Sequence, residues 1–175
     1  TLGTLRMLEW AGHGVRQVVL LSTSRVYSLP KIKALRLQET ATRYHLVEDD
    51  ELDVVSKYGV TTEFSTRHSG SLYGASKLSA EALVENWADE VGAGAVINRC
   101  GVVTGPGQFG NSSQGFFQYF VEACRTGHEV TFRGWGGSGK QVRDILYIDD
   151  LVSLLDAQIF PRGSSDSSAI WNVSG

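Results

Sequence analysis

The stretch SLYGASKLSAEALVENWADEVGAGAVINRC, residues 71–100, decides the fold, because a predicted helix is followed almost directly by a predicted buried strand. Apolar residues recur at helical spacing from Leu72 to Leu83, and Gly92 is a typical helix end. GAVINRC, residues 94–100, is expected to form the buried strand. A helix that leads into such a strand is typical of α/β proteins with a parallel sheet.

The same alternation of helices and strands extends along the rest of the chain. Further helices are expected at the start, ending at Gly12 or Gly14, at residues 116–127, and at residues 149–160, where Asp149 or Asp150 could cap the helix. Further strands are expected at Val18–Leu21, which should be buried, and at residues 129–133, 142–148 and 170–175. Residues 28–70 indicate short elements or a functional flap, and residues 161–169 a loop. The pattern predicts an α/β layered fold with a mostly parallel sheet, truncated at both ends.

Composition narrows the class of protein. The chain has 175 residues, 42% of them apolar and 20% charged, which is typical of one globular domain. Its net charge of −3 gives no basic face for nucleic acid, and no apolar run approaches the ~20 residues that cross a bilayer. The N-terminal residues lack the order of a signal peptide, and the cysteines, Cys100 and Cys124, and the histidines lack metal-ligand spacing. We therefore expect no nucleic-acid partner, membrane or metal site, and a cytoplasmic location.

Tyr73 and Lys77 are the first candidates for chemistry. Four residues apart on a helix, their side chains lie on one face, one turn apart. Tyrosine in general has a pKa near ~10, and a neighbouring ammonium group stabilises the phenolate form. The spacing therefore suits a tyrosine that exchanges a proton with an alcohol or a ketone. A solvated helix face without a catalytic role is the alternative.

Two further features lie near the ends of predicted strands. The hydroxyl run STS, residues 22–24, follows an apolar strand, and ligands bind beyond the carboxyl ends of strands in open α/β sheets. Arg143 precedes another apolar run, and its guanidinium suits phosphate oxygens. The alternatives are an ordinary strand-end turn for the hydroxyls, and an ion pair with Asp144 or Asp149 for the arginine.

The segment GWGGSGKQ, residues 134–141, matches the start of a phosphate-binding P-loop. A P-loop continues with Ser or Thr after its lysine and opens a helix, whereas this chain has Gln141 and a predicted strand. We therefore interpret the segment as a flexible loop that leads to Arg143.

Taken in order, these motifs resemble the extended short-chain dehydrogenase/reductase family, in particular its NAD-dependent nucleotide-sugar epimerases and dehydratases. The resemblance covers nearly the whole chain. It rests on GTLRMLEWA (residues 3–11), STSRVY (22–27), LYGASKLSAE (72–81), NRCGVVTGPGQ (98–108) and GKQVRDILYIDDL (139–151). Within that family, the chain is most similar to CDP-paratose 2-epimerases, through QETATRYHLV (38–47), HSGSLYGASK (68–77), GPGQFG (105–110), SQG (113–115) and GSGKQVRD (137–144).

The resemblance implies that NAD-dependent oxidation to a keto sugar, followed by re-reduction, inverts one carbon of a nucleotide-diphosphate sugar. Tyr73 would be the catalytic acid and base, Lys77 would assist it and hold the nicotinamide ribose, and Thr23 would bind the reacting sugar oxygen. The implied cofactor-binding residues are Ser22, Thr23, Tyr73, Lys77 and Cys100. The implied substrate-binding residues are Ser24, Arg25, Gln108, Phe109 and Arg143, with Arg143 on the diphosphate. A homodimer through the helix that contains residues 71–90 is also implied.

Two departures from the family pattern shape these expectations. The family's 4,6-dehydratases carry Asp-Glu after the active-site threonine, where this chain has Ser24 and Arg25, which favours an epimerase. The family's glycine fingerprint for NAD, Gly-x-x-Gly-x-x-Gly, does not occur before residue 100, so we expect the N-terminal half of a Rossmann domain to be absent.

The expected architecture is therefore a truncated, Rossmann-like, doubly wound parallel sheet with a small C-terminal substrate-binding part. Residues 1–100 would form half of an NAD-binding domain with the catalytic helix. Residues 101–175 would form substrate-binding loops and strands, mixed with the last Rossmann elements. The alternatives are another nucleotide-sugar 4-epimerase, a 4,6-dehydratase or a reductase of the same superfamily, or a non-catalytic fragment or binding module.

Overall fold

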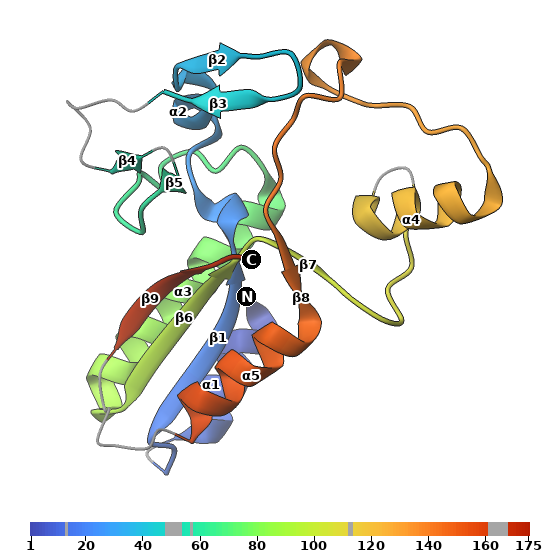
Figure 1. Ribbon diagram of the computed structural model, residues 1–175. Coiled ribbons are helices and arrows are strands. Elements are labelled where there is room, and N and C mark those ends of the chain that lie inside the picture. The colour runs from blue at the N-terminus through green and yellow to red at the C-terminus, as the bar shows by residue number, and fades with distance from the viewer. Residues whose placement is uncertain (13, 48–53, 57, 112–113, 161–167) are drawn as a thin grey trace.

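The computed structural model describes residues 1–12, 14–47, 54–56, 58–111, 114–160 and 168–175. A parallel sheet forms its centre, with the strand order β1 (Gln17–Thr23), β6 (Gly94–Cys100) and β9 (Ala169–Val173). β6 is buried along its whole length because a strand pairs with it on each side. Figure 1 shows α1 (Leu2–Ala11) and α3 (Leu72–Val91) on one face of the sheet and α5 (Ile148–Ile159) on the other. Helices on both faces of a parallel sheet confirm the predicted doubly wound, Rossmann-like fold.

The helices predicted at the start of the chain and at residues 71–92 are confirmed, and each ends at a predicted glycine. α1 stops at Gly12, and α3 stops at Gly92, which has a left-handed φ of 70°. At the start of α3, the Ser71 hydroxyl accepts a hydrogen bond from Gly74 N–H at 3.0 Å. A core packs α1 and α3 against the sheet and consists of Leu8, Val84, Ala88 and Ala95, with Val18, Leu20, Leu83 and Trp87 partly buried against it.

Between β1 and α3 the described residues form short elements, as predicted for residues 28–70. These are η1 (Ser24–Val26), α2 (Leu29–Ala34), the hairpin β2 (Leu37–Glu39) and β3 (Tyr44–Leu46), and the pair β4 (Val55–Ser56) and β5 (Gly59–Val60). After β6 come β7 (Val102–Thr104), α4 (Phe116–Thr126), η2 (Trp135–Gly137) and β8 (Ile145–Tyr147), of which β7 and β8 pair in parallel. No helix within the described ranges is long and apolar enough to cross a bilayer.

Three expectations about the elements were wrong. Residues 129–133 form no strand, because Phe132 packs edge-on against Phe120 of α4, at 5.9 Å between ring centroids, instead of joining a sheet. The helix expected from residue 149 begins at Ile148, so Tyr147 is its N-cap, and the two aspartates lie in its first turn, where they complement the helix dipole. The third error concerns β1, which is only partly buried, with Leu21 41% exposed, because it is an edge strand. Most of the loop expected at residues 161–169, namely residues 161–167, lies outside the described residues. So does Ser113, the first residue of the SQG motif.

Candidate active site

The carboxyl ends of β1 and β6 meet at one edge of the sheet, where Thr23 pairs in register with Cys100. Thr23 is buried, and its Oγ1 accepts a hydrogen bond from Arg25 N–H at 3.3 Å, which caps η1. Ser24 and Arg25, in that turn, are exposed. The predicted hydroxyl run therefore lies where ligands bind in open α/β sheets.

The first turn of α3 lies directly on η1, next to the end of β1. A Cβ atom added to Gly74 would come within 2.3 Å of the Arg25 carbonyl oxygen, so a side chain at this position would prevent the close approach. Lys77 Nζ donates a hydrogen bond to the Leu21 carbonyl oxygen at 2.9 Å. Tyr73 is 52% exposed in the same part of the helix. The contacts of Gly74 and Lys77 bring the first turns of α3, which carry the predicted acid–base pair, to the edge that carries the β1 hydroxyls.

Cys100 closes this edge from the β6 side. Burial raises the pKa of the Cys100 thiol, and the positive charge of Lys77 opposes that shift. The thiol lies 3.5 Å from the Asn98 carbonyl oxygen. A buried thiol with a raised pKa is a neutral contact surface rather than a nucleophile. Within the described ranges, no group of three or more His, Cys, Asp or Glu residues could hold a metal ion.

A buried ion pair, which the sequence analysis missed, lies beneath the same edge. Glu81 of α3 and Arg99 of β6 are 1% and 6% exposed, and Arg99 Nη2 lies 2.8 Å from Glu81 Oε2. Ser22 Oγ donates to the other carboxylate oxygen, so the hydroxyl predicted to bind the cofactor contacts Glu81. Arg99 Nη1 donates to the Tyr27 hydroxyl at 3.3 Å and to the Thr62 carbonyl oxygen at 2.9 Å. The pair fixes α3 to both β1 and β6.

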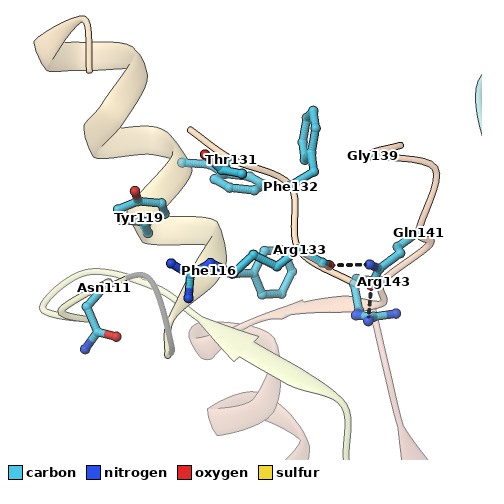
Figure 2. A pocket seen from close by; sticks show the side chains of 10 residues that line it. Asn111, Phe116, Tyr119, Thr131, Phe132, Arg133, Gly139, Gln141 and Arg143 are labelled. Carbon is cyan, nitrogen blue, oxygen red and sulfur yellow. Dashed lines mark hydrogen bonds between the residues drawn. The ribbon is translucent and has the colours of Figure 1, made fainter. Parts of the chain in front are cut away.

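A hollow of about 300 Å³ lies between α4 and the segment that follows it (Figure 2). Aromatic rings of α4 form one wall and Phe132 faces them, while two guanidinium groups, Arg133 and Arg143, provide positive charge. Sequence analysis predicted only Arg143 of this set. The residues that line the hollow, which we call the aromatic cavity, are Asn111, Phe116, Tyr119, Phe120, Thr131, Phe132, Arg133, Gly139, Gln141 and Arg143.

Within the described part of the chain, the acceptors of the Arg143 hydrogen bonds are neutral. Its Nη1 donates to the Val142 carbonyl oxygen at 3.0 Å, and its Nη2 donates to Gln141 Oε1. Among the described residues no carboxylate forms an ion pair with it; Asp144, the alternative partner, accepts from Gly175 N–H at 2.9 Å. Burial, and then the positive charge of Arg25, lower the pKa of Arg143. Such a guanidinium is suited to an anionic ligand.

Gln108 and Phe109, the other predicted substrate residues, do not line the aromatic cavity. Gln108 Nε2 donates to the Val103 carbonyl oxygen, and Gln108 Oε1 accepts from the Thr104 hydroxyl, each at 2.9 Å. Phe109 is 94% exposed. Their contact with a substrate stays a prediction.

Comparison with known proteins agrees with the fold. The model of the NAD dependent epimerase/dehydratase family matches residues 1–174. The CDP-paratose 2-epimerase of Salmonella typhi is 31% identical over 161 residues, which are 87% of this chain and 43% of that protein. The dTDP-D-glucose 4,6-dehydratase of Dictyostelium discoideum is 29% identical over 137 residues, 78% of this chain and 30% of that protein.

Among solved structures, a mutant of the UDP-glucuronic acid 4-epimerase of Bacillus cereus, in complex with a UDP-sugar analogue and NAD, superposes with a TM-score of 0.70. It is 22% identical and aligns with 99% of this chain and 45% of its own length, which supports the fold. The chain thus spans less than half the length of the proteins that it matches. Because the family model covers nearly every residue, the chain belongs to the NAD-dependent epimerase/dehydratase family.

Proposed function

We propose that this chain contributes the acid–base residues and the nucleotide-sugar site of an epimerase that acts on a CDP-3,6-dideoxyhexose and inverts carbon 2. The observation that carries the proposal is the docking of α3 on the end of β1, through Gly74 and Lys77. It supports a site in which Tyr73, in the first turn of α3, acts beside the buried Thr23. Similarity to the Salmonella typhi relative supports the choice of a CDP-sugar.

The proposed NAD site fits the chain at one end of the cofactor. Lys77 at the strand-end edge and the neutral Cys100 thiol suit the nicotinamide and its ribose. The pyrophosphate needs a glycine turn that leads from a strand into a helix. The glycine-rich residues 134–139 lead to β8 instead, and so do not fit it. When bound, NAD would supply the hydride acceptor and donor.

In the proposed reaction, Tyr73 takes the proton of a sugar hydroxyl and later returns a proton to the keto oxygen. The Thr23 hydroxyl holds that oxygen, and Lys77 places positive charge beside the phenol. The aromatic cavity would hold the nucleoside diphosphate, with a base against Phe132 and the diphosphate on Arg143. This anchor lets the keto sugar turn its other face without leaving the protein.

Substitution of Tyr73 by phenylalanine tests the assignment, in this chain joined to the glycine-fingerprint half of the Salmonella typhi relative. We expect turnover to fall by about 10²–10⁴-fold, because the proton donor is lost, while the CDP-sugar still binds. Ser79→Ala is the control, because it removes an exposed hydroxyl from the same helix. Near-normal turnover in Tyr73→Phe would contradict the role. Net consumption of NADH would instead identify a reductase, and loss of water a dehydratase.

We also propose a homodimer through α1 and α3. Large apolar side chains are exposed on these helices, including Met7 at 69%, Trp10 at 85% and Leu72 at 92%. A second copy could cover them, which sedimentation velocity would detect; a monomer at all concentrations would contradict the dimer.

A reducing cytoplasm is the proposed location, since both cysteines are free.

A further inference from the structure

The β2–β3 hairpin contacts the segment that carries Arg143, although the residues in contact are as much as 101 positions apart (Figure 1). Lys140 Nζ lies 2.6 Å from Glu39 Oε1 of β2. Tyr44 N–H, in β3, donates to the Lys140 carbonyl oxygen at 3.0 Å. The Tyr44 ring also packs on Trp135, with ring centroids 5.6 Å apart. An ion pair, a backbone hydrogen bond and a ring contact therefore hold the two segments together.

The backbone of the contacted segment is in an unusual conformation. Trp135 has a φ of 51°, in the left-handed region that bulky residues rarely adopt. Such a conformation persists only where the surrounding structure holds it. Here the Tyr44 ring lies against the Trp135 side chain, and glycines with positive φ stand on both sides. The hairpin is thus part of what fixes the path of the chain toward Arg143.

Contacts continue from this segment into the aromatic cavity. Next to Lys140, Gln141 Nε2 donates to the Arg133 carbonyl oxygen at 2.6 Å, and Gln141 Oε1 accepts from Arg143 (Figure 2). Gln141 and Arg143 also line a second hollow of about 290 Å³, together with Tyr44 and His45 of the hairpin. Gln141 and Arg143 therefore lie between the hairpin and the aromatic cavity and line a hollow on each side.

We propose that Glu39 and Tyr44 are positioning residues that hold Gln141 and Arg143 in place for a nucleoside diphosphate. They act through Lys140 and Trp135 and touch no substrate themselves. The inference rests on the proposed function, because it takes the aromatic cavity to be the nucleotide site. The inference adds that recognition of the diphosphate depends on the β2–β3 hairpin, which lies far from Arg143 in the sequence.

Calorimetry with CDP and UDP on the 175-residue chain tests the proposal. We expect the double variant Glu39→Gln/Tyr44→Leu to bind about tenfold more weakly, from the loss of an ion pair and a ring contact. Tyr44→Phe keeps the ring and should bind as the unaltered chain does. Glu122→Gln is the matched control, because it breaks another exposed ion pair, with Arg125 on α4, and should leave affinity unchanged.

Limited trypsin digestion separates positioning from a merely structural contact. Cleavage after Lys140 and Arg143 should become faster in the double variant, since the segment is released, and affinity should fall with it. Faster cleavage with unchanged affinity would overturn the positioning role, and so would unchanged cleavage. If the unaltered chain binds neither CDP nor UDP, the nucleotide assignment itself fails and the positioning role fails with it, whatever the digestion shows.

Discussion

Replacement of Arg99 by methionine would leave the Glu81 carboxylate buried without its counter-charge. Arg99 is 6% exposed and donates to both oxygens of Glu81, to the Tyr27 hydroxyl and to the Thr62 carbonyl oxygen. Methionine occupies much of the same space but donates none of these bonds. Removal of one partner from a buried ion pair destabilises a protein by about 3–5 kcal/mol. For a chain of this size that loss corresponds to a fall in Tm of about 10 °C.

Urea unfolding, followed by tryptophan fluorescence, measures the free energy of unfolding in a double-mutant cycle. Arg99→Met and Glu81→Leu should each be strongly destabilising, whereas the double variant should lose less than the sum, by about 2 kcal/mol, because neither charge is left unpaired. The matched control is Arg6→Met, which breaks an exposed ion pair with Glu9, 2.9 Å long, and should cost less than about 1 kcal/mol. Additive losses, or an Arg99→Met loss no larger than that of Arg6→Met, would refute the reasoning.

Three further predictions concern α3 and the cofactor. Gly74→Ala should lower the Tm, because the added Cβ would lie 2.3 Å from the Arg25 carbonyl oxygen. Gly3→Ala in α1 is the control and should raise the Tm, because open space surrounds that position. A Tm that rises in Gly74→Ala and falls in Gly3→Ala would contradict this account. Burial, and then the negative charge of Glu81, raise the pKa of Glu85 in the folded chain. The protonated Glu85 side chain therefore stabilises the fold at acid pH, and this contribution is lost as the pH rises through the pKa of Glu85 in the folded chain. Glu85→Gln should therefore stabilise by about 0.3 kcal/mol at pH 7 and by less at pH 4, and a gain that does not vary with pH would disprove this. The 175 residues alone should show no micromolar affinity for NAD in calorimetry, because they lack the glycine fingerprint; measurable micromolar binding would exclude that account.

The fold was predictable where the information is local. Helical spacing and the glycine stops defined α1 and α3, and the apolar run of β6 defined the central strand. The error at residues 129–133 has a tertiary cause. Alternating apolar residues favour a strand, but Phe132 packs on α4, and nothing in the local sequence distinguishes the two uses. β7 was missed because three residues carry too little pattern.

The candidate site was predictable only where motifs and sheet geometry agree. Thr23 and the first turns of α3, which carry Tyr73 and Lys77, lie at one edge because the parallel strands end together and the YxxxK pair begins the next helix. The roles of these three residues stay predictions. The Glu81–Arg99 pair had a sequence signal that was not used, since an arginine within a buried strand needs a buried counter-charge. The aromatic walls had none, because α4 and residues 131–133 meet only through tertiary packing.

The charges around the strand-end edge support the proposed exchange of a proton and a hydride over the alternative, the elimination of water. Elimination needs a carboxyl acid and base beside the sugar, and the positions that hold them in the family's dehydratases hold Ser24 and Arg25 here. Arg25 instead adds positive charge near Arg143, where it contributes to the lowered pKa of that guanidinium. Two cations that repel each other gain from an anion that both attract. Under the proposed epimerase function, Arg25 would therefore add to the attraction of Arg143 for a diphosphate, and a firmly held diphosphate would keep the nucleotide in place while the keto sugar turns.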